Sequence, residues 1–270
     1  MNDFFHRVRE RYRYPAIILR AMVVSDLKLR YQASFLGYLW TLLRPLAEFA
    51  ILYVVFTKFI RLVGGPDWAI CLLLGTVIWG FFGELTVQGL TSIVARGPLL
   101  CKVNFPRYVV VLSVTVSVVI SFILNLVVIA IFMLASRVFV GVEALWFLLL
   151  ILELVTLTVA VSLFLGALYV RLRDIDYIWQ VLTRAAFFAT PIIYSLSLVP
   201  EKWARILVLN PVAQIIQDAR HVLVSDQYVT ISGLWGTEWI RAVPIGITLV
   251  LAVTSVIFFR RRSRSFAEEA

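Results

Sequence analysis

Charged residues are scarce in this sequence. Only 15% of its 270 residues are Asp, Glu, Lys or Arg, while 61% are hydrophobic. Soluble domains carry about 25% charged and about 45–50% apolar residues. So little charge cannot cover the surface of a soluble protein of this length. The composition therefore predicts an integral membrane protein whose spans take up nearly the whole chain, which excludes a sizeable soluble domain.

Residues that usually bind metals or carry catalysis are also few. The only histidines, His6 and His221, lie far apart in the sequence, and Cys71 and Cys101 fall on opposite sides of the predicted membrane. Neither a metal site nor a disulfide is therefore expected. The sequence also lacks the Gly-x-x-x-x-Gly-Lys-Ser/Thr phosphate loop. We therefore expect no catalytic residues, no bound cofactor and no ATP site of that kind in this chain.

Grouped carboxylates occur near a predicted span only in the segment Arg173-Asp174-Ile175-Asp176. A membrane enzyme of polyprenyl-linked glycan assembly would need such a group to hold Mg²⁺ at the membrane face. A solvated loop between two spans explains the same residues. The enzyme reading remains an alternative, and the scarcity of grouped carboxylates argues against it.

Long apolar runs dominate what is present. A span of the roughly 30 Å hydrocarbon core takes about 20 helical residues. Six runs meet this length, at residues 37–60, 68–95, 108–139, 144–170, 177–198 and 242–259. Between the last two lies segment 199–241, broken by Pro200, Pro211 and Gly233. Its apolar pieces 203–209 and 212–216 are too short to span, which favours two re-entrant or interfacial half-helices.

Basic residues mark one side of the membrane. They gather in the tail before residue 15, in the 96–107 and 171–173 connections and after residue 259. Because Lys and Arg are retained in cytoplasmic loops, both termini are predicted to be cytoplasmic. The formal net charge of +9 is then explained by these loops, and no nucleic-acid partner is expected.

The N-terminal region leads into the first span. Residues 1–36 are predicted to form a cytoplasmic tail and an interfacial helix, and residues 37–270 a six-span domain. Gly37 lacks a Cβ and permits a sharp change of direction between them. Tyr38 and Trp40 suit the membrane interface. An ordinary amphipathic anchor before any span would share these properties.

Several short motifs occur in one order along the chain. They are Arg30-Tyr31…Ser34-x-Leu36-Gly37-x-x-Trp40…Pro45, Lys102-x-x-Phe105-Pro106, Arg171-x-Arg173-Asp174-Ile175-x-Tyr177, Thr190-Pro191-Ile192-Ile193-Tyr194, and Asn210-Pro211 with Arg220. In this order and spacing the sequence resembles the permease subunits of ABC-2 type polysaccharide exporters, which serve O-antigen, capsule and teichoic acid export. The resemblance covers essentially the whole chain.

The resemblance implies an all-α integral membrane fold: six transmembrane helices, an N-terminal interfacial helix and two outer re-entrant half-helices. It implies a transport subunit of the cytoplasmic (inner) membrane that exports a lipid-linked polysaccharide. Two permeases would form a homodimer with two ATPase subunits, which bind ATP and Mg²⁺. An ABC-2 exporter of small lipophilic molecules is an alternative, as is an ion-coupled carrier or channel.

Two segments are assigned roles by this resemblance. The loop 96–107 would contact the ATPase and couple its closure to transport, with Arg96, Leu99, Leu100, Lys102, Phe105 and Arg107. A plain connection between spans is the other interpretation of this loop. The N-terminal segment 30–40 would form the gate where the substrate enters, with Arg30, Tyr31, Ser34, Leu36, Gly37 and Trp40.

Two further sets of residues are candidates within the spans. Aromatic faces stack on sugar rings, so Tyr53, Phe56, Phe187 and Phe188 are candidates for a substrate path, although lipid contact or helix packing explains them too. Intramembrane charges usually face the protein interior. This predicts buried charges at Glu48, Glu84, Glu153 and Arg184, with an Arg44–Glu48 pair and a Glu84–Arg184 pair as hypotheses. The alternative for Glu84 and Arg184 is that one faces a water-filled path alone.

Overall fold

The structure is a computed structural model that describes residues 2–31, 36–60, 67–103, 105–138 and 141–263; of residues 2–13, 30–31 and 101 it describes the backbone. Within these ranges every regular element is a helix, as predicted. The α-helices are α1 (Asn2–Tyr31), α2 (Trp40–Val54), α3 (Trp68–Ala95), α4 (Gly97–Lys102), α5 (Tyr108–Ala135), α6 (Leu145–Tyr169), α7 (Ile175–Ala189), α8 (Glu201–Leu207), α9 (Pro211–Leu223), α10 (Ile231–Trp235) and α11 (Ala242–Arg262). Short elements accompany them: η1 (Gly37–Leu39), the π-helix η2 (Val55–Phe59), η3 (Val142–Ala144), η4 (Leu196–Leu198) and η5 (Glu238–Arg241).

The predicted membrane spans are largely present. Among the described residues, five helical stretches are long and apolar enough to cross a bilayer: Gly37–Phe59, Trp68–Ala95, Tyr108–Ala135, Val142–Tyr169 and Glu238–Arg262. They correspond to the first four and the last of the six predicted runs. In a bilayer only internally hydrogen-bonded elements such as helices can span, so hydropathy alone locates them well.

The fifth predicted run differs from the expectation. Its helix, α7, ends at Ala189 after 15 residues, a rise of about 22 Å that falls short of the roughly 30 Å core. The cause is local: Thr190 adopts an extended conformation (ψ 137°) directly before Pro191. The proline ring disfavours helical geometry at the preceding residue. The remaining residues of the run, 190–198, form turns and η4.

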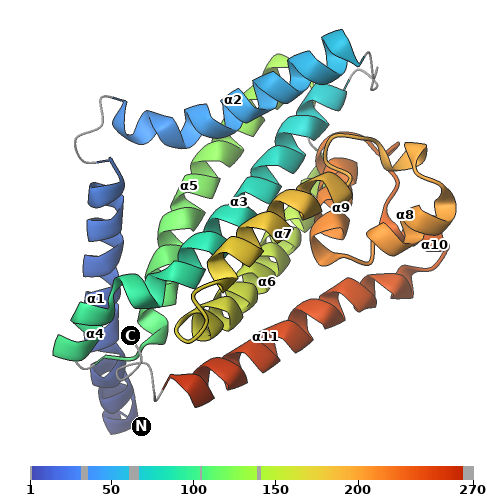
Figure 1. The fold of residues 1–270 in the computed structure, drawn as a ribbon. Coiled ribbons are helices and arrows are strands. Elements are labelled where there is room, and N and C mark those ends of the chain that lie inside the picture. Colours follow the sequence, from blue (N-terminus) through green and yellow to red (C-terminus); the bar gives the residue numbers. More distant parts are fainter. Residues whose placement is uncertain (1, 32–35, 61–66, 104, 139–140, 264–270) are drawn as a thin grey trace.

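Helix α3 forms the centre of the bundle. It is apolar around its whole circumference, and such a helix is buried on all sides in a folded protein. In its most apolar stretch 78% of the residues are buried, compared with none in the corresponding stretch of the first span. Helices α2, α5, α6, α7 and α9 contact it (Figure 1).

Small residues bring α3 and α6 into close contact. A Cβ added to Gly89 would lie 2.6 Å from the Cβ of Ser162, and one added to Gly166 would lie 3.2 Å from the Gly89 carbonyl oxygen. The Ser162 hydroxyl lies 3.1 Å from the Leu85 carbonyl oxygen across the interface. Helices within a membrane often associate through such small residues, because burial of apolar surface gives little driving force there.

The two ends of the bundle differ in character. Figure 1 places α4, the α6–α7 connection and the C-terminal end of α11 at one end, and α8, α9 and α10 at the other. The basic residues of the 96–107, 171–173 and 260–262 segments therefore lie at the same end. The broken segment 199–241 folds into short helices at the opposite end, with α9 contacting α3, α6 and α11.

Candidate coupling surface and transport path

The predicted coupling loop begins with helix α4. Pro98 lies in its first turn, where a proline costs no hydrogen bond. Leu99 is 39% exposed, and Lys102 is also exposed. Leu100 is half-buried against Phe105 and its neighbours. Of the apolar side chains expected on this loop, Leu99 is therefore the one available to a partner protein.

Phe105 has a different environment from the one expected. Its side chain is only 7% exposed and packs with Met22 of α1 and with Val109 and Val110 of α5. It cannot serve as an exposed contact for another protein. The prediction missed this because it treated α1 as a separate interfacial helix, whereas α1 lies against the start of α5 (Figure 1). Arg107 is half-buried beside it.

An ion pair ties these elements together. Arg96 is the single residue between α3 and α4. One terminal nitrogen of its guanidinium pairs with Asp26 of α1, and the other donates to the Ser113 hydroxyl of α5 at 2.5 Å. Both charged side chains are less than a quarter exposed. Arg96 was predicted to touch the ATPase, yet its contacts within the chain join α1, α4 and α5. Asp26 was not singled out, because nothing in the sequence links it to a residue 70 positions away.

The segment assigned to the gate is described in part. Ser34 lies outside the described residues, and Arg30 and Tyr31 end α1, with only their backbone described. Gly37 has a positive φ of +48°, which confirms the sharp turn predicted there. Leu36 is half-buried, and Trp40 is exposed at the start of α2.

The candidate aromatic residues lie where α2, α3 and α7 meet. Tyr53 of α2 stacks on Trp68 of α3 with ring centroids 5.9 Å apart. Phe56 and Phe187 pack on the same cluster around Trp68, and Phe187 also contacts Trp79 edge-on at 6.1 Å. Phe188 contacts Phe187 and is exposed. The structure brings the four candidates together on one side of the single chain.

The predicted in-span charges separate into two groups. Glu84 and Glu153 are half-buried, whereas Glu48 and Arg184 lie on the surface of the single chain. These last two side chains lie on α2 and α7, neither of which has a buried residue. Glu48 pairs with Arg44 at 3.4 Å, as predicted for residues four apart. Glu84 accepts a hydrogen bond from Gln88 at 2.9 Å, and Arg184 is not among the ion pairs seen between described side chains.

Arg220 was noted in the sequence only as part of a motif. In α9 it is almost fully buried and donates to the backbone carbonyls of Pro191 (2.8 Å), Ile192 (2.6 Å) and Cys71 (3.2 Å). The first two belong to the turn that ends α7, and the third belongs to α3. Gly75 leaves the space for it, since a Cβ there would lie 3.1 Å from the guanidinium. Arg220 therefore fastens α9 to α3 and to the end of α7.

Asp218 lies one turn before the end of α9. Its carboxylate accepts a hydrogen bond from the Gln214 side-chain amide at 2.7 Å, within the same helix. The His221 Nδ1 lies 2.9 Å from the Tyr228 carbonyl oxygen.

The start of α9 is fixed by a side-chain cap. Asn210 accepts a hydrogen bond from the Val212 amide at 3.0 Å, and Pro211 lies in the first turn of the helix.

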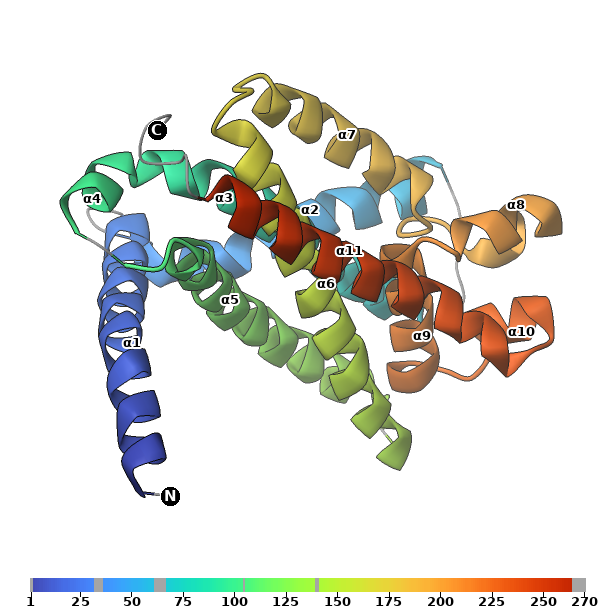
Figure 2. The same ribbon diagram turned by 90° about the horizontal axis from the view of Figure 1, so that it is seen from below.

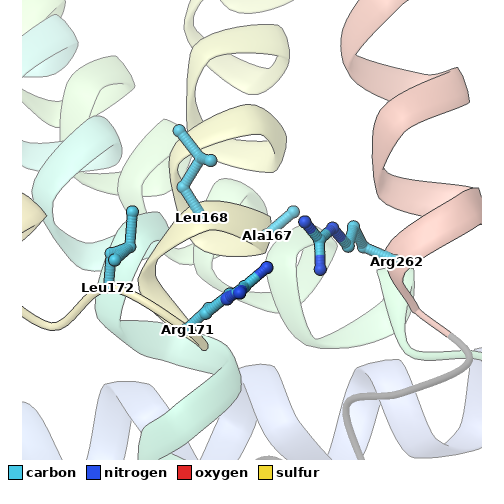
Figure 3. A pocket seen from close by; sticks show the side chains of 5 residues that line it. All are labelled: Ala167, Leu168, Arg171, Leu172 and Arg262. Atoms are coloured by element: carbon cyan, nitrogen blue, oxygen red, sulfur yellow. The ribbon is translucent and has the colours of Figure 1, made fainter.

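A small pocket of about 210 Å³ lies at the basic end of the bundle (Figure 3). Its walls are Ala167, Leu168, Arg171 and Leu172 from the end of α6, and Arg262 from the end of α11. Figure 3 shows the two arginine side chains extending toward each other across it. Both arginine side chains bring positive charge to this pocket.

Comparison with known proteins agrees with this architecture. Residues 18–224 match the family described as ABC-2 type transporter. The chain is similar to the O-antigen export system permease protein RfbA of Myxococcus xanthus, with 30% identity over 263 residues that cover 97% of this chain and 98% of the relative. Two proteins of the same name from Klebsiella pneumoniae are 29% and 27% identical over 254 and 252 residues, in each case 93% of this chain and 94% of the relative.

Proposed function

The chain belongs to the ABC-2 type transporter family, and we propose that it is the permease subunit of an ABC exporter that moves a lipid-linked polysaccharide across the cytoplasmic membrane. As a member of this family it is a transport subunit and not an enzyme. The proposed substrate class rests on similarity along the whole chain to three O-antigen export permeases. Each of them aligns with this chain over at least 94% of its own length.

Export is powered by ATP hydrolysis in a separate subunit that contacts the basic end of the bundle. Support comes from the cluster of cationic residues there and from the absence of a phosphate loop in the sequence. Both termini are then cytoplasmic. Helix α7 with the turns that follow it serves as the fifth crossing in chain order, which brings the number of crossings to six. Helices α8 and α9 are the half-helices that dip back into the outer side.

The functional unit is proposed to be a homodimer that meets through α2 and α7. Neither helix has a buried residue in the single chain. Both present apolar side chains outward, including Ile51, Val54, Val181 and Phe188. If two copies face each other along these helices, Tyr53, Phe56, Phe187 and Phe188 lie at the interface, where their rings can contact sugar units of the passing chain.

Coupling to the ATPase is proposed to use the exposed part of α4, with Leu99 and Lys102 as direct contacts. Arg96 transmits the motion through its ion pair with Asp26 of α1. Leu100, Phe105 and Arg107 hold the loop on the bundle. We expect Leu99→Ala with Lys102→Ala to weaken co-purification of the ATPase while the permease stays folded. Arg205→Ala, a partly exposed cation on α8 at the end of the bundle opposite α4 (Figure 1), is the matched control. Unchanged ATPase binding and export in the double variant would make α4 a connector only.

Deletion of the gene tests the function as a whole. We expect cells without the permease to lose the polysaccharide from their surface and to accumulate it, still lipid-linked, on the cytoplasmic side. Antibody labelling of intact against permeabilised cells measures both quantities. A complementing permease restores surface labelling only when its ATPase partner can hydrolyse ATP. Normal surface polysaccharide in the deletion strain would refute the proposal.

A further inference from the structure

A second cavity, of about 570 Å³, lies between α6, α9 and α11. Its walls come from the first half of α6, from α9 and from the start of α11, which lie together in Figures 1 and 2. Small-molecule sites usually measure about 300–1,000 Å³. None of the residues assigned to coupling, gating or the sugar path lines it, although the in-span Glu153 does.

The cavity is lined by polar atoms that have no hydrogen-bond partner among the described residues. They are Glu153 Oε1, Gln214 Oε1, Asp218 Oδ1, Thr248 Oγ1 and Arg241 Nε. Gln214, Asp218 and Thr248 are only 3%, 5% and 2% exposed. A buried polar atom without a partner is costly, so native proteins rarely leave one unpaired. Five such atoms around one cavity, four oxygens and one guanidinium N–H, indicate an occupant that both donates and accepts hydrogen bonds.

The chemistry of the walls restricts the occupant. Glu153, Gln214 and Asp218 all present acceptor oxygens, which suit a group with several N–H donors and a positive charge. The described residues contain no group of three or more His, Cys, Asp or Glu side chains able to hold a metal ion. Arg241 and His221 line another part of the cavity, where Arg241 supplies positive charge and His221 a ring nitrogen. The site therefore offers complementary surfaces for a cation and an anion side by side.

The open side of the cavity is apolar. Leu149 and Leu152 of α6 and Ile245 and Leu249 of α11 line it and are exposed on the surface of the bundle. Glu153 lies about 12 Å along α6 from its first residue, by the rise of an α-helix. The cavity thus opens sideways within a membrane-spanning region, where its ligand arrives from the lipid rather than from water.

We propose that this cavity binds a phospholipid whose headgroup carries a primary ammonium. The ammonium donates to Glu153, Asp218 and the Gln214 amide oxygen, the phosphate lies near Arg241 and His221, and the acyl chains follow Leu149, Leu152, Ile245 and Leu249. The bound lipid thus contacts α6, α9 and α11 together.

Lipid quenching of tryptophan fluorescence tests the proposal, because Trp146 lines the cavity. The full chain is placed in nanodiscs of unlabelled phosphatidylcholine with a small fraction of a probe lipid that has brominated acyl chains. Three probes are compared: phosphatidylethanolamine, phosphatidylcholine and phosphatidylglycerol. The signal from Trp146 is the difference between the wild type and Trp146→Phe. Phosphatidylcholine is the matched probe, since its methyl groups keep the charge and remove every N–H donor.

We expect the ethanolamine lipid to quench Trp146 at about tenfold lower mole fraction than the choline lipid, the ratio for one hydrogen bond to a charged group. Glu153→Gln with Asp218→Asn should abolish this preference, whereas Glu48→Gln, a carboxylate on α2 outside the cavity, should retain it. Equal quenching by the ethanolamine and choline lipids in the wild type overturns the proposal, whether or not the double variant folds. So does preference for the glycerol lipid, no quenching by any probe, or an ethanolamine preference that survives in the double variant.

Discussion

Replacement of Arg220 is the sharpest test of how the outer half of the bundle is held together. Arg220→Met keeps a long side chain of similar reach in α9 but removes the guanidinium that joins α9 to Pro191, Ile192 and Cys71. We expect the variant to insert into the membrane and to be clearly less stable than the wild type. The turn after α7 should detach from α9 and α3.

The magnitude follows from the carbonyls left behind. Cys71 is inside α3, whereas the Pro191 and Ile192 carbonyls belong to the irregular turn after α7. The Pro191 carbonyl also accepts a hydrogen bond from the Gln217 side chain at 3.4 Å, so the Ile192 carbonyl is the one that loses its donor outright. A buried acceptor that loses its donor costs about 1–3 kcal/mol. The weakened bonding of the Pro191 carbonyl adds to this loss and removal of a buried charge returns part of it, so the net loss should be about 1–3 kcal/mol. At about 2–4 °C per kcal/mol for a chain of this size, the apparent melting temperature should fall by roughly 2–12 °C.

Two measurements check this expectation. Size-exclusion chromatography after heating in detergent gives the apparent melting temperature. Labelling of Cys71 with a maleimide, in a Cys101→Ser background, reports opening beside the guanidinium, because the Cys71 side chain is buried in the intact protein. We expect Cys71 to be protected in the wild type and labelled in Arg220→Met, with Arg220→Lys between them, since one ammonium cannot reproduce the two-nitrogen contact.

Arg205→Met provides the matched control. Arg205 lies on α8 in the same outer region, but it is partly exposed and pairs with Glu201 one turn away. An exposed pair of this kind contributes about 0–1 kcal/mol, so the control should melt near the wild-type temperature. The reasoning fails if Arg220→Met melts within about 1 °C of the wild type and keeps Cys71 protected, because even the smallest expected loss corresponds to about 2 °C.

Three further predictions concern the contacts that position the spans. Gly89→Ala should cost about 1–3 kcal/mol by overpacking against Ser162, and Ser162→Gly in the same chain should recover most of it; a double variant that melts no higher than Gly89→Ala would contradict the close contact. Asp26→Asn and Arg96→Gln should each make α1 more sensitive to protease, and a double variant with the summed effects of both would argue against the ion pair. Phe105→Ala should lower the melting temperature, consistent with a loss of about 3–5 kcal/mol for a buried phenylalanine; normal stability with lost ATPase binding would instead favour an exposed docking role.

Hydropathy was sufficient to predict the helical class and most spans, because a long apolar run has few alternatives to a membrane helix. The turn at Gly37 was likewise predicted from local chemistry, since a positive φ is a property of one residue. The early end of α7 was also encoded locally, in Thr190-Pro191, but the apolar run through residue 198 concealed it.

Contacts between distant segments could not be predicted in the same way. Nothing in the sequence pairs Asp26 with Arg96, or Arg220 with carbonyls 29 and 149 residues away. Backbone carbonyls leave no signature in a sequence, so a buried arginine that uses them is indistinguishable from an exposed one. The burial of Phe105 depends in the same way on where α1 lies.

The central position of α3 has a consequence for biogenesis. This helix enters the bilayer before α5, α6, α7 and α9, which later cover it, and it contains hydroxyl groups that end up buried. Thr76, Thr86 and Ser92 each donate to a carbonyl of their own helix, those of Leu72, Phe82 and Gly89, at 2.7–2.8 Å. None of these donors depends on a helix that has yet to be synthesised. Helix α3 can therefore remain in lipid without an unsatisfied hydroxyl until its neighbours assemble around it.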